Sequence, residues 1–262
     1  MSQDRVGVVI PTFNRCGQLM SALDSVLQQT RAVDEIIVVD DGSTDGTPEM
    51  LEQFASRHAD RQIRIIRQEN RGPSAARNAG IKAANAELIA FLDDDDIWLP
   101  HKTERQLAVF ASDPRLALLG CASNIVSLFG GLHLVRIGEW AMLFRNWFAT
   151  PTVMVRREVA LACGGFPEDL RQYEDYALWL KISGAHKCAF LNEKLVSCGD
   201  GKPPFGHSGL SADLEACYAG EREVHRRWRN ERNVSWPVFA LVSLHSWMRH
   251  VRRKYIASRR QA

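Results

Sequence analysis

Carboxylates gather at three points along the chain, and their types and spacing could support chemistry. Four consecutive aspartates, Asp93–Asp96, follow an apolar run; Asp40–Asp41 follow another; and Glu174–Asp175 open a helical pattern. Adjacent like charges repel most strongly where water is scarce, so a cation would stabilise the aspartate run. Carboxylate oxygens suit Mg²⁺ or Mn²⁺, and these ions suit a diphosphate. A solvated acidic loop is the alternative reading of the same four residues.

The two other carboxylate pairs also have two interpretations each. Asp40, at the tip of an apolar run, either belongs to a polar strand-to-helix turn or accepts a hydrogen bond from a ligand. Glu174 and Asp175 either complement the positive end of a helix dipole, or one of them acts as a general base. The sequence contains no glycine fingerprint for dinucleotide binding, no P-loop and no serine nucleophile elbow, which argues against those three classes of enzyme.

The elements that must position these carboxylates follow from the hydrophobic pattern. Continuous apolar runs separated by helical patterns predict a mostly parallel sheet covered on both faces. We expect strands at 6–10, 35–40, 63–66 and 87–92, and helices at 17–29, 47–58 and 72–85, with Thr47 as N-cap and Pro48 at the first helical position. Ligands bind beyond the carboxyl ends of such strands, so the polar clusters after the first, second and fourth strands should share one edge.

The second half of the chain is less regular. We expect a helix at 100–112, strands near 116–121, 132–137 and 152–155, a helix at 174–183, a Gly/Pro-rich loop at 199–209, and helices beyond it.

Charge is distributed unevenly along the 262 residues. The whole chain has 33 basic and 31 acidic side chains; the segment from Arg222 onward has eleven and two, which leaves 22 and 29 before it. The body therefore carries −7 and the C-terminal segment +9. This segment is either a terminal helix packed on the body or an interfacial helix on an anionic bilayer. Nucleic-acid binding is a third and weaker interpretation, because aromatic and basic residues interleave only in this segment of the chain, and we expect no nucleic-acid partner.

Cysteine usage and hydropathy bear on location. The six cysteines include no CxxC pair, which disfavours a zinc site and favours reduced thiols, as in a cytosol. No signal-peptide layout and no apolar run of about 18 residues occurs. We therefore expect a cytoplasmic protein, peripheral on the inner face of the membrane if the tail binds lipid.

Five stretches, taken in order, resemble the motifs of family 2 glycosyltransferases of the GT-A fold, from about Val6 to about Ser183. They are VVIPTFNR, VVDDGSTDGT, RGPSAARNAGI, FLDDDDIWLP and YEDYALWLKI. The resemblance implies an α/β GT-A domain over 1–221, with a nucleotide-binding part at about 1–100 and an acceptor part at about 101–221. A basic helical tail would follow at 222–262.

The resemblance also implies roles for single residues. Asp175 would be the catalytic base, and Asp95 would bind the metal, Mn²⁺ or Mg²⁺. The donor-binding residues would be Pro11, Thr12, Arg15, Asp40, Asp41, Arg77, Asp93 and Asp94. The four-aspartate run leaves the register of Asp93 and Asp94 open between ribose and a metal-bound water. Lys181 stands where the family usually has arginine, so it receives no role, and neither does His207.

The function implied is metal-dependent, inverting transfer of a sugar from a nucleotide-sugar donor, UDP-sugar first among them. The acceptor would be a saccharide or lipid-linked saccharide in surface polysaccharide synthesis. The Q/R-x-x-R-W signature of processive members is absent, which favours one sugar per acceptor. The rivals are a sugar nucleotidyltransferase and a non-catalytic calcium-binding or scaffold protein.

Overall fold

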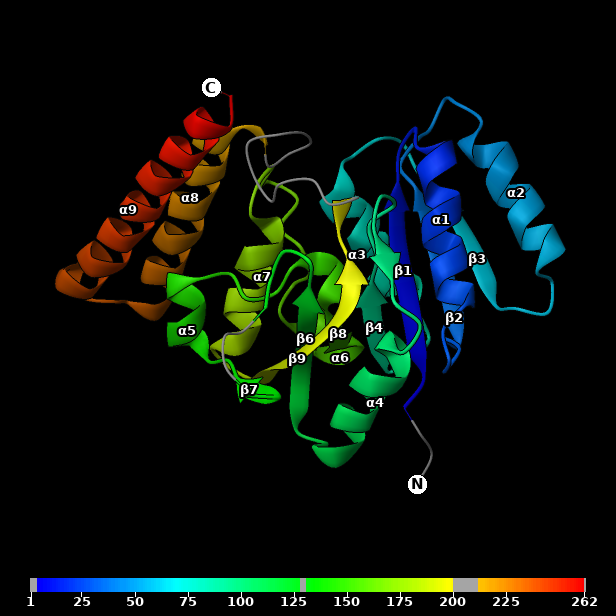
Figure 1. Ribbon diagram of the computed structural model, residues 1–262, viewed down its shortest axis with the longest axis horizontal. Helices are drawn as coiled ribbons and strands as arrows, with labels where there is room; N and C mark the ends of the chain where they lie inside the picture. Colours follow the sequence, from blue (N-terminus) through cyan, green and yellow to red (C-terminus); the bar gives the residue numbers. More distant parts are fainter. Residues whose placement is uncertain (1–3, 128–130, 200–211, 262) are drawn as a thin grey trace.

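The computed structural model describes residues 4–127, 131–199 and 212–261. Within them, nine strands form one sheet in the order β3-β2-β1-β4-β8-β6-β9-β5, with β7 paired to β9 (Figure 1). The strands are β1 Val6–Thr12, β2 Glu35–Asp40, β3 Ile63–Arg67, β4 Leu88–Phe91, β5 Ile97–Trp98, β6 Leu116–Ser123, β7 Leu134–Arg136, β8 Met154–Arg156 and β9 Lys187–Ser197. The helices are α1 Cys16–Leu27, α2 Thr47–Arg57, α3 Pro73–Ala83, α4 Lys102–Ser112, α5 Glu139–Phe144, α6 Arg157–Ala162, α7 Glu174–Ser183, α8 Leu214–Arg232 and α9 Trp236–Gln261, with a 3₁₀ turn at Thr150–Thr152.

The expected parallel arrangement holds for β1 to β4: β1 pairs in parallel with β2 and β4, and β2 pairs in parallel with β3. Successive residues of β1 point to opposite faces, so Val9 enters one core cluster and Val8 the other. The Val9 cluster includes Ala76 of α3 and Trp179 of α7, whereas the Val8 cluster includes Leu19 of α1. Helices therefore cover both faces, as continuous apolar strands require.

The second half of the sheet is mixed. β8 joins β4 and β6 by antiparallel pairing, and β9 runs parallel to β6 but antiparallel to β5 and β7. The sequence did not predict the eleven-residue strand β9, because the polar stretch 192–194 interrupts its apolar run. The α/β class with flanking helices and a helical C-terminal region is confirmed.

One detail of the expected helix starts is wrong. The N-cap of α2 is Gly46 rather than Thr47, which is the first helical residue, with Pro48 following it inside the first turn. Thr47 is fully buried, so packing rather than capping accounts for its position.

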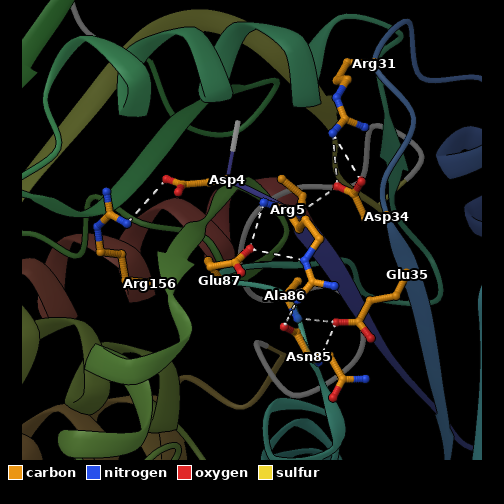
Figure 2. Close-up of polar contacts among 10 residues, drawn as sticks. Asp4, Arg5, Arg31, Asp34, Glu35, Asn85, Ala86, Glu87 and Arg156 are labelled. Carbon is orange, nitrogen blue, oxygen red and sulfur yellow. Dashed lines mark hydrogen bonds and ion pairs between the residues drawn. The ribbon is translucent and has the colours of Figure 1, made fainter. Parts of the chain in front are cut away.

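Acidic residues at the amino ends of the strands have partners that belong to the fold itself (Figure 2). Glu35 is buried and accepts hydrogen bonds from the backbone amides of Asn85 and Ala86, both at 2.7 Å. Asp34 accepts from the amide of Val6 at 2.8 Å and pairs with Arg31. These carboxylates tie the ends of strands to neighbouring backbone amides and to Arg31.

The C-terminal helices form an antiparallel pair at one end of the molecule, with α9 outermost beside α8 (Figure 1). Val242 and Ser246 of α9 are fully buried, and Arg249 pairs with the buried Glu221 of α8 at 3.1 Å. One face of the terminal helix is thus part of the fold. The boundary expected at residue 222 falls within α8.

All six cysteines are free. In the part of the chain that the structure describes, no helix combines the length and apolar character needed to cross a bilayer.

Candidate active site

The loops after β1, β2 and β4 meet at one edge of the sheet, as the strand pattern predicted. Thr12, the last residue of β1, donates from Oγ1 to Oδ2 of Asp94 at 2.9 Å. Arg15 reaches Oδ2 of Asp95 from Nη1 at 3.2 Å. The backbone amide of Asn14 donates to Oγ of Ser43 at 2.9 Å, which joins the first loop to the second. Parallel strands place their carboxyl ends together, and this brings residues more than 80 positions apart into contact.

Asp40 and Asp41 are both buried but have different surroundings. Oδ1 of Asp40 accepts from the amide of Ser43 at 2.8 Å, while Oδ2 is buried without a hydrogen bond, 3.6 Å from Nε of Arg67. A buried carboxylate oxygen without a hydrogen bond is costly, and it is an acceptor available to a donor group on a ligand. The side chain of Arg67 is 59% exposed and could move aside.

Asp41 is saturated by the protein itself. Its Oδ1 accepts from Nε2 of Gln68 at 2.7 Å and from the amide of Arg71 at 3.0 Å, and its Oδ2 accepts from the amide of Gly72 at 2.7 Å. Gly72 is the N-cap of α3, with φ of 89°. Asp41 therefore holds the loop before α3 in place. Its predicted role in donor binding would be to position that loop, because its own oxygens are already engaged.

The aspartate run is crowded, and its pKa values reflect this. Burial raises the pKa of Asp94 to about 6, and the charges of Asp93 and Asp95 add to the rise. Burial and the charge of Asp93 raise the pKa of Asp96 to about 8, although Oδ1 of Asp96 accepts from the amide of Gly199 at 2.8 Å. The carboxylates therefore repel one another as the sequence suggested, and positive charge would relieve that repulsion.

Arg77 connects the aspartate run to the helix that carries Asp175. From α3 it donates through Nη2 to Oδ1 of Asp93 at 2.7 Å and through Nη1 to Oε1 of Glu174 at 3.1 Å. The guanidinium is buried, and these carboxylates raise its pKa despite the cost of burial. Its Nε is buried without a hydrogen-bond partner. The nucleotide contact expected for Arg77 would thus come from a group already engaged by two carboxylates.

Asp175 lies at the start of α7 among polar groups of the segment after α5. Its Oδ2 accepts from Nδ2 of Asn146 at 3.3 Å and from Oγ1 of Thr150 at 3.4 Å. Burial raises the pKa of Asp175 to about 7, and the adjacent charge of Glu174 adds to the rise. A carboxyl group with a pKa near neutrality suits a general base. Sequence reasoning missed Asn146 and Thr150, which lie in a stretch without hydrophobic periodicity.

The backbone before Asp175 is strained. Tyr173, the N-cap of α7, has φ of 65° and ψ of 23°, a left-handed conformation that is uncommon for a bulky residue. Its hydroxyl accepts from Nη1 of Arg253 of α9 at 2.7 Å. Such strain persists where the surroundings enforce it and is frequent at active sites. Here it turns the chain so that Glu174 and Asp175 begin α7 beside Arg77.

A buried hydrogen-bond network fixes α7 from the side of the C-terminal helices. The hydroxyl of Tyr176 donates to the carbonyl of Met142 at 3.0 Å and lies 2.9 Å from Nε2 of His225. Burial lowers the pKa of His225 to about 4, so its ring is neutral at pH 7. The network holds α7, α5 and α8 in one arrangement, and with them the segment that bears Asn146.

The residues at this edge fit an open site for a divalent cation rather than a closed one. No group of three or more His, Cys, Asp or Glu side chains among the described residues is arranged to enclose a metal ion. Mg²⁺ in phosphate-binding sites usually takes one or two carboxylates, and substrate phosphates and water complete its shell. Asp95, whose side chain is 37% exposed, could serve as such a ligand, and the crowded charge of the aspartate run favours a cation beside it.

Pro11 is buried within β1, next to Thr12. Lys181 is exposed on α7. His207 lies outside the described residues.

Comparison with known proteins agrees with this architecture. The model of the family described as glycosyl transferase family 2 matches residues 7–164. An uncharacterized glycosyltransferase of Rickettsia conorii is 32% identical over 202 residues, which cover 74% of this chain and 33% of that protein. The chain thus spans about a third of the length of several curated relatives that it matches.

One matched relative has a specific name. The protein WfgD of Escherichia coli, named as a UDP-Glc:alpha-D-GlcNAc-diphosphoundecaprenol beta-1,3-glucosyltransferase, is 28% identical over 207 residues, which cover 72% of this chain and 76% of that protein.

Solved structures show the same fold at low identity. Residues 1–349 of TarS from S. aureus in complex with UDP-GlcNAc give a TM-score of 0.70 at 20% identity, covering 94% of this chain and 72% of that one. The mannosyltransferase PcManGT of Pyrobaculum calidifontis, in complex with GDP-Man and Mn²⁺, gives 0.66 at 22% identity, covering 94% and 69%. The fold is GT-A, and with the family model matching more than half of its residues, the chain belongs to glycosyl transferase family 2.

Proposed function

We propose that this protein is a metal-dependent, inverting glycosyltransferase that moves one sugar from a nucleotide-sugar donor, a UDP-sugar first among them, to a hydroxyl group of an acceptor. One observation carries the proposal. Arg77 contacts both Asp93 and Glu174, so the aspartate run at the donor edge and the helix start with Asp175 lie on either side of one buried side chain. A transferase needs its leaving-group site and its base this close together.

The chemistry is a single displacement. The acceptor hydroxyl oxygen attacks the anomeric carbon, its proton passes to Oδ2 of Asp175, and the bond from that carbon to the diphosphate oxygen breaks with its electron pair. One base opposite the leaving group gives inversion at the carbon. Asn146 and Thr150 orient Oδ2 of Asp175 for the transfer, since both hydroxyl and amide donate to it.

A divalent cation, Mn²⁺ or Mg²⁺, would neutralise charge on the leaving diphosphate when bound. Asp95 would hold it, with Asp93 and Asp94 close enough to contact the ribose or water on the ion. Arg15 pairs with Asp95 and would share the phosphate side of the site. Asp40 would accept from the base of the nucleotide, because its Oδ2 is buried without a hydrogen bond.

Relatives support the choice of donor and acceptor. TarS and PcManGT are described with UDP-GlcNAc and with GDP-Man and Mn²⁺, and the name of WfgD specifies a sugar on a diphosphate-linked polyprenol as acceptor. We therefore propose a saccharide or lipid-linked saccharide acceptor in the assembly of a surface polysaccharide, at the cytoplasmic face of a membrane. The six free cysteines are compatible with a reducing compartment.

The test is turnover of a panel of UDP- and GDP-sugars with Mn²⁺, with and without saccharide acceptors, for the wild type and for Asp175→Asn. We expect metal-dependent release of the nucleoside diphosphate, and a fall of about 10²–10⁴ in turnover in the variant. Binding of the donor, measured by calorimetry, should stay within about threefold, because Asp175 contacts no donor group in this mechanism.

Asp169→Asn is the matched control, since Asp169 precedes the same helix but pairs with Arg227 on the surface. It should keep wild-type turnover. Formation of a nucleotide sugar from a sugar phosphate and a nucleoside triphosphate would identify a nucleotidyltransferase instead. Calcium binding without turnover of any donor would identify a scaffold.

A further inference from the structure

The outward face of α9 is apolar and lacks a protein partner in the described residues. Leu241, Leu244, Met248, Val251 and Tyr255 recur at spacings of three and four, which places them along one side of the helix. Each is 45–58% exposed, and Trp247 beside them is 51% exposed. We call these six residues the α9 stripe. It is unlike the scattered apolar residues of an ordinary surface, because it continues over about four turns.

The stripe lies opposite the face by which α9 packs on the protein. Val242, Ser246 and His250 are buried, and they fall on the other side of the helix from Leu244 and Met248. Figure 1 shows α9 as the outermost element at its end of the molecule, so no other labelled element covers the stripe. The packing that holds α9 in place therefore also fixes the direction in which the stripe points.

Charge identifies the occupant. α9 contains six lysines and arginines and no acidic residue. Arg252 and Arg259 are exposed next to the stripe, and the Arg259 guanidinium lies over the ring of Tyr255 at 4.9 Å. A dimer formed by two copies of this chain through this face would bring their arginines close together. Because α9 has no acidic residue, these like charges would repel. An anionic lipid surface offers both the negative charge and the apolar depth that the face requires.

We propose that the α9 stripe, with Arg252 and Arg259, is the surface by which the protein docks on an anionic phospholipid bilayer, with α9 lying in the interface. Trp247 and Tyr255 have amphipathic rings, which favour the headgroup level of a bilayer. Val238 packs against the core, and the ring of His245 lies edge-to-face on Phe144 with ring centroids 5.1 Å apart, so neither belongs to the docking surface.

The same geometry places the catalytic edge beside the bilayer. Arg253, on the packed side of α9, donates to the hydroxyl of Tyr173 at 2.7 Å, and Tyr173 directly precedes Glu174 and Asp175. A helix with its side chains is about 10–12 Å across. The start of α7, with Asp175, would therefore lie behind α9 and Tyr173 as seen from the lipid surface, near enough for a saccharide attached to a lipid headgroup. This last step depends on the proposed function, but docking itself does not.

The test is co-flotation of the full-length protein with vesicles of phosphatidylcholine alone or with 30% phosphatidylglycerol (on the order of the anionic content that produces a surface potential). We expect binding to the anionic vesicles only, and binding that weakens as salt rises. Arg252→Gln with Arg259→Gln should lower the partition coefficient by about fivefold for each arginine. Leu244→Gln with Met248→Gln should lower it by about tenfold or more, because two apolar side chains no longer enter the interface.

Matched variants elsewhere on the surface are the controls. Arg57→Gln with Arg61→Gln removes two arginines from the region of α2, at the far end of the molecule from α9 (Figure 1). Leu132→Gln with Leu134→Gln removes two exposed leucines at the β7 edge. Both should keep wild-type binding. Thermal unfolding confirms that each variant is folded, and hydrolysis of free donor measures the active site separately.

Equal binding of the α9 variants and the controls, or equal binding to neutral and anionic vesicles, would overturn the proposal. Light scattering tests whether a second copy of the chain occupies the stripe instead. A wild-type dimer that does not bind vesicles, and that becomes a monomer in the Leu244→Gln, Met248→Gln variant, would assign the stripe to a dimer interface. Loss of donor hydrolysis in every protein tested, with vesicle binding intact, would contradict the proposed function and leave the docking surface standing.

Discussion

At the scale of single residues, environment separates carboxylates that the sequence presents as equivalent. Both oxygens of Asp41 accept hydrogen bonds from the protein, and one oxygen of Glu35 accepts two from backbone amides. Asp40 keeps one buried oxygen without a hydrogen bond. Asp175 accepts a short bond on Oδ1 from the amide of Tyr176 at 2.6 Å, but its Oδ2 accepts long bonds from Asn146 and Thr150, and burial raises its pKa to about 7. The candidates for chemistry are the carboxylates whose environment leaves them under-satisfied.

The raised pKa of Asp175 predicts how turnover depends on pH. The base must be ionised to accept a proton, so turnover at saturating donor and metal should rise through pH 7 and level off above it. A pH profile of the wild type and of Asp169→Asn checks this. A flat profile between pH 5.5 and 8.5 would show that ionisation of Asp175 does not limit the reaction.

The same shift predicts a stability effect of opposite sign. The folded-state pKa of Asp175 is raised above its unfolded value of about 3.9, so the contribution to stability is present at acid pH and is lost as pH rises through about 7. Asp175→Asn should therefore be more stable than the wild type above pH 7 and equal to it near pH 4. Urea denaturation at both values measures this; lower stability of the variant at pH 8 would contradict it.

Metal binding can be tested at Asp95. Asp95→Asn should abolish Mn²⁺-dependent donor binding and transfer while leaving the fold intact, because Asp95 is partly exposed and its only described partner is Arg15. Titration of Mn²⁺ in the presence of donor, with thermal unfolding as the control for folding, measures the loss. Near-normal turnover in the variant would assign the metal to another aspartate of the run.

At the scale of elements, close packing positions α3 and so places Arg77. A Cβ added to Gly80 of α3 would lie 2.3 Å from Cγ1 of Val9 in β1, which is far inside van der Waals contact. Both atoms are in the core, so neither can move away into solvent. The helix therefore sits directly on the central strand, and Arg77, less than one turn earlier, is brought to Asp93 and Glu174.

Gly80→Ala should destabilise the protein by about 1–3 kcal/mol through overpacking, although alanine is the better helix former. Gly17→Ala in α1 is the matched control: no atom lies within 4 Å of its added Cβ, so it should be neutral or stabilising by up to about 1 kcal/mol. Urea denaturation of both variants decides the matter. Equal stability of the two would show that β1 and α3 can separate without cost.

At the scale of the whole molecule, α9 belongs to the fold and also presents a free face. Its inner face supplies Val242 to the core and Arg249 to Glu221, which is only 2% exposed. Its outer face carries the α9 stripe. The basic C-terminal segment is thus packed on the acidic body through Val242 and the Arg249–Glu221 pair. The uneven charge along the sequence therefore becomes a separation of charge in space.

Removal of residues 236–262 should destabilise the protein by about 3–5 kcal/mol, because Val242 leaves the core, the face of α8 on which α9 packs is exposed, and the pair of Arg249 with Glu221 is lost. Thermal and urea unfolding of the truncated chain measure the loss. Arg249→Met in the full-length chain breaks the same ion pair while keeping the helix, and should account for much of the effect. A truncated chain as stable as the wild type would show that α9 contributes little to the fold.

Sequence patterns alone predicted the parallel half of the sheet, the edge at which its loops meet and the family. These features depend on hydrophobic periodicity and on motifs within short stretches, such as the run that ends at Asp93–Asp96. Such patterns can be recognised without knowing how distant segments pack. Tertiary structure alone decided the rest. Strand β9, the contact of Arg77 with Glu174, the polar neighbours of Asp175 and the outward face of α9 all depend on residues distant in sequence. Which carboxylates are saturated, and which helix face is left bare, follows from what packs against them, and no local pattern contains that information.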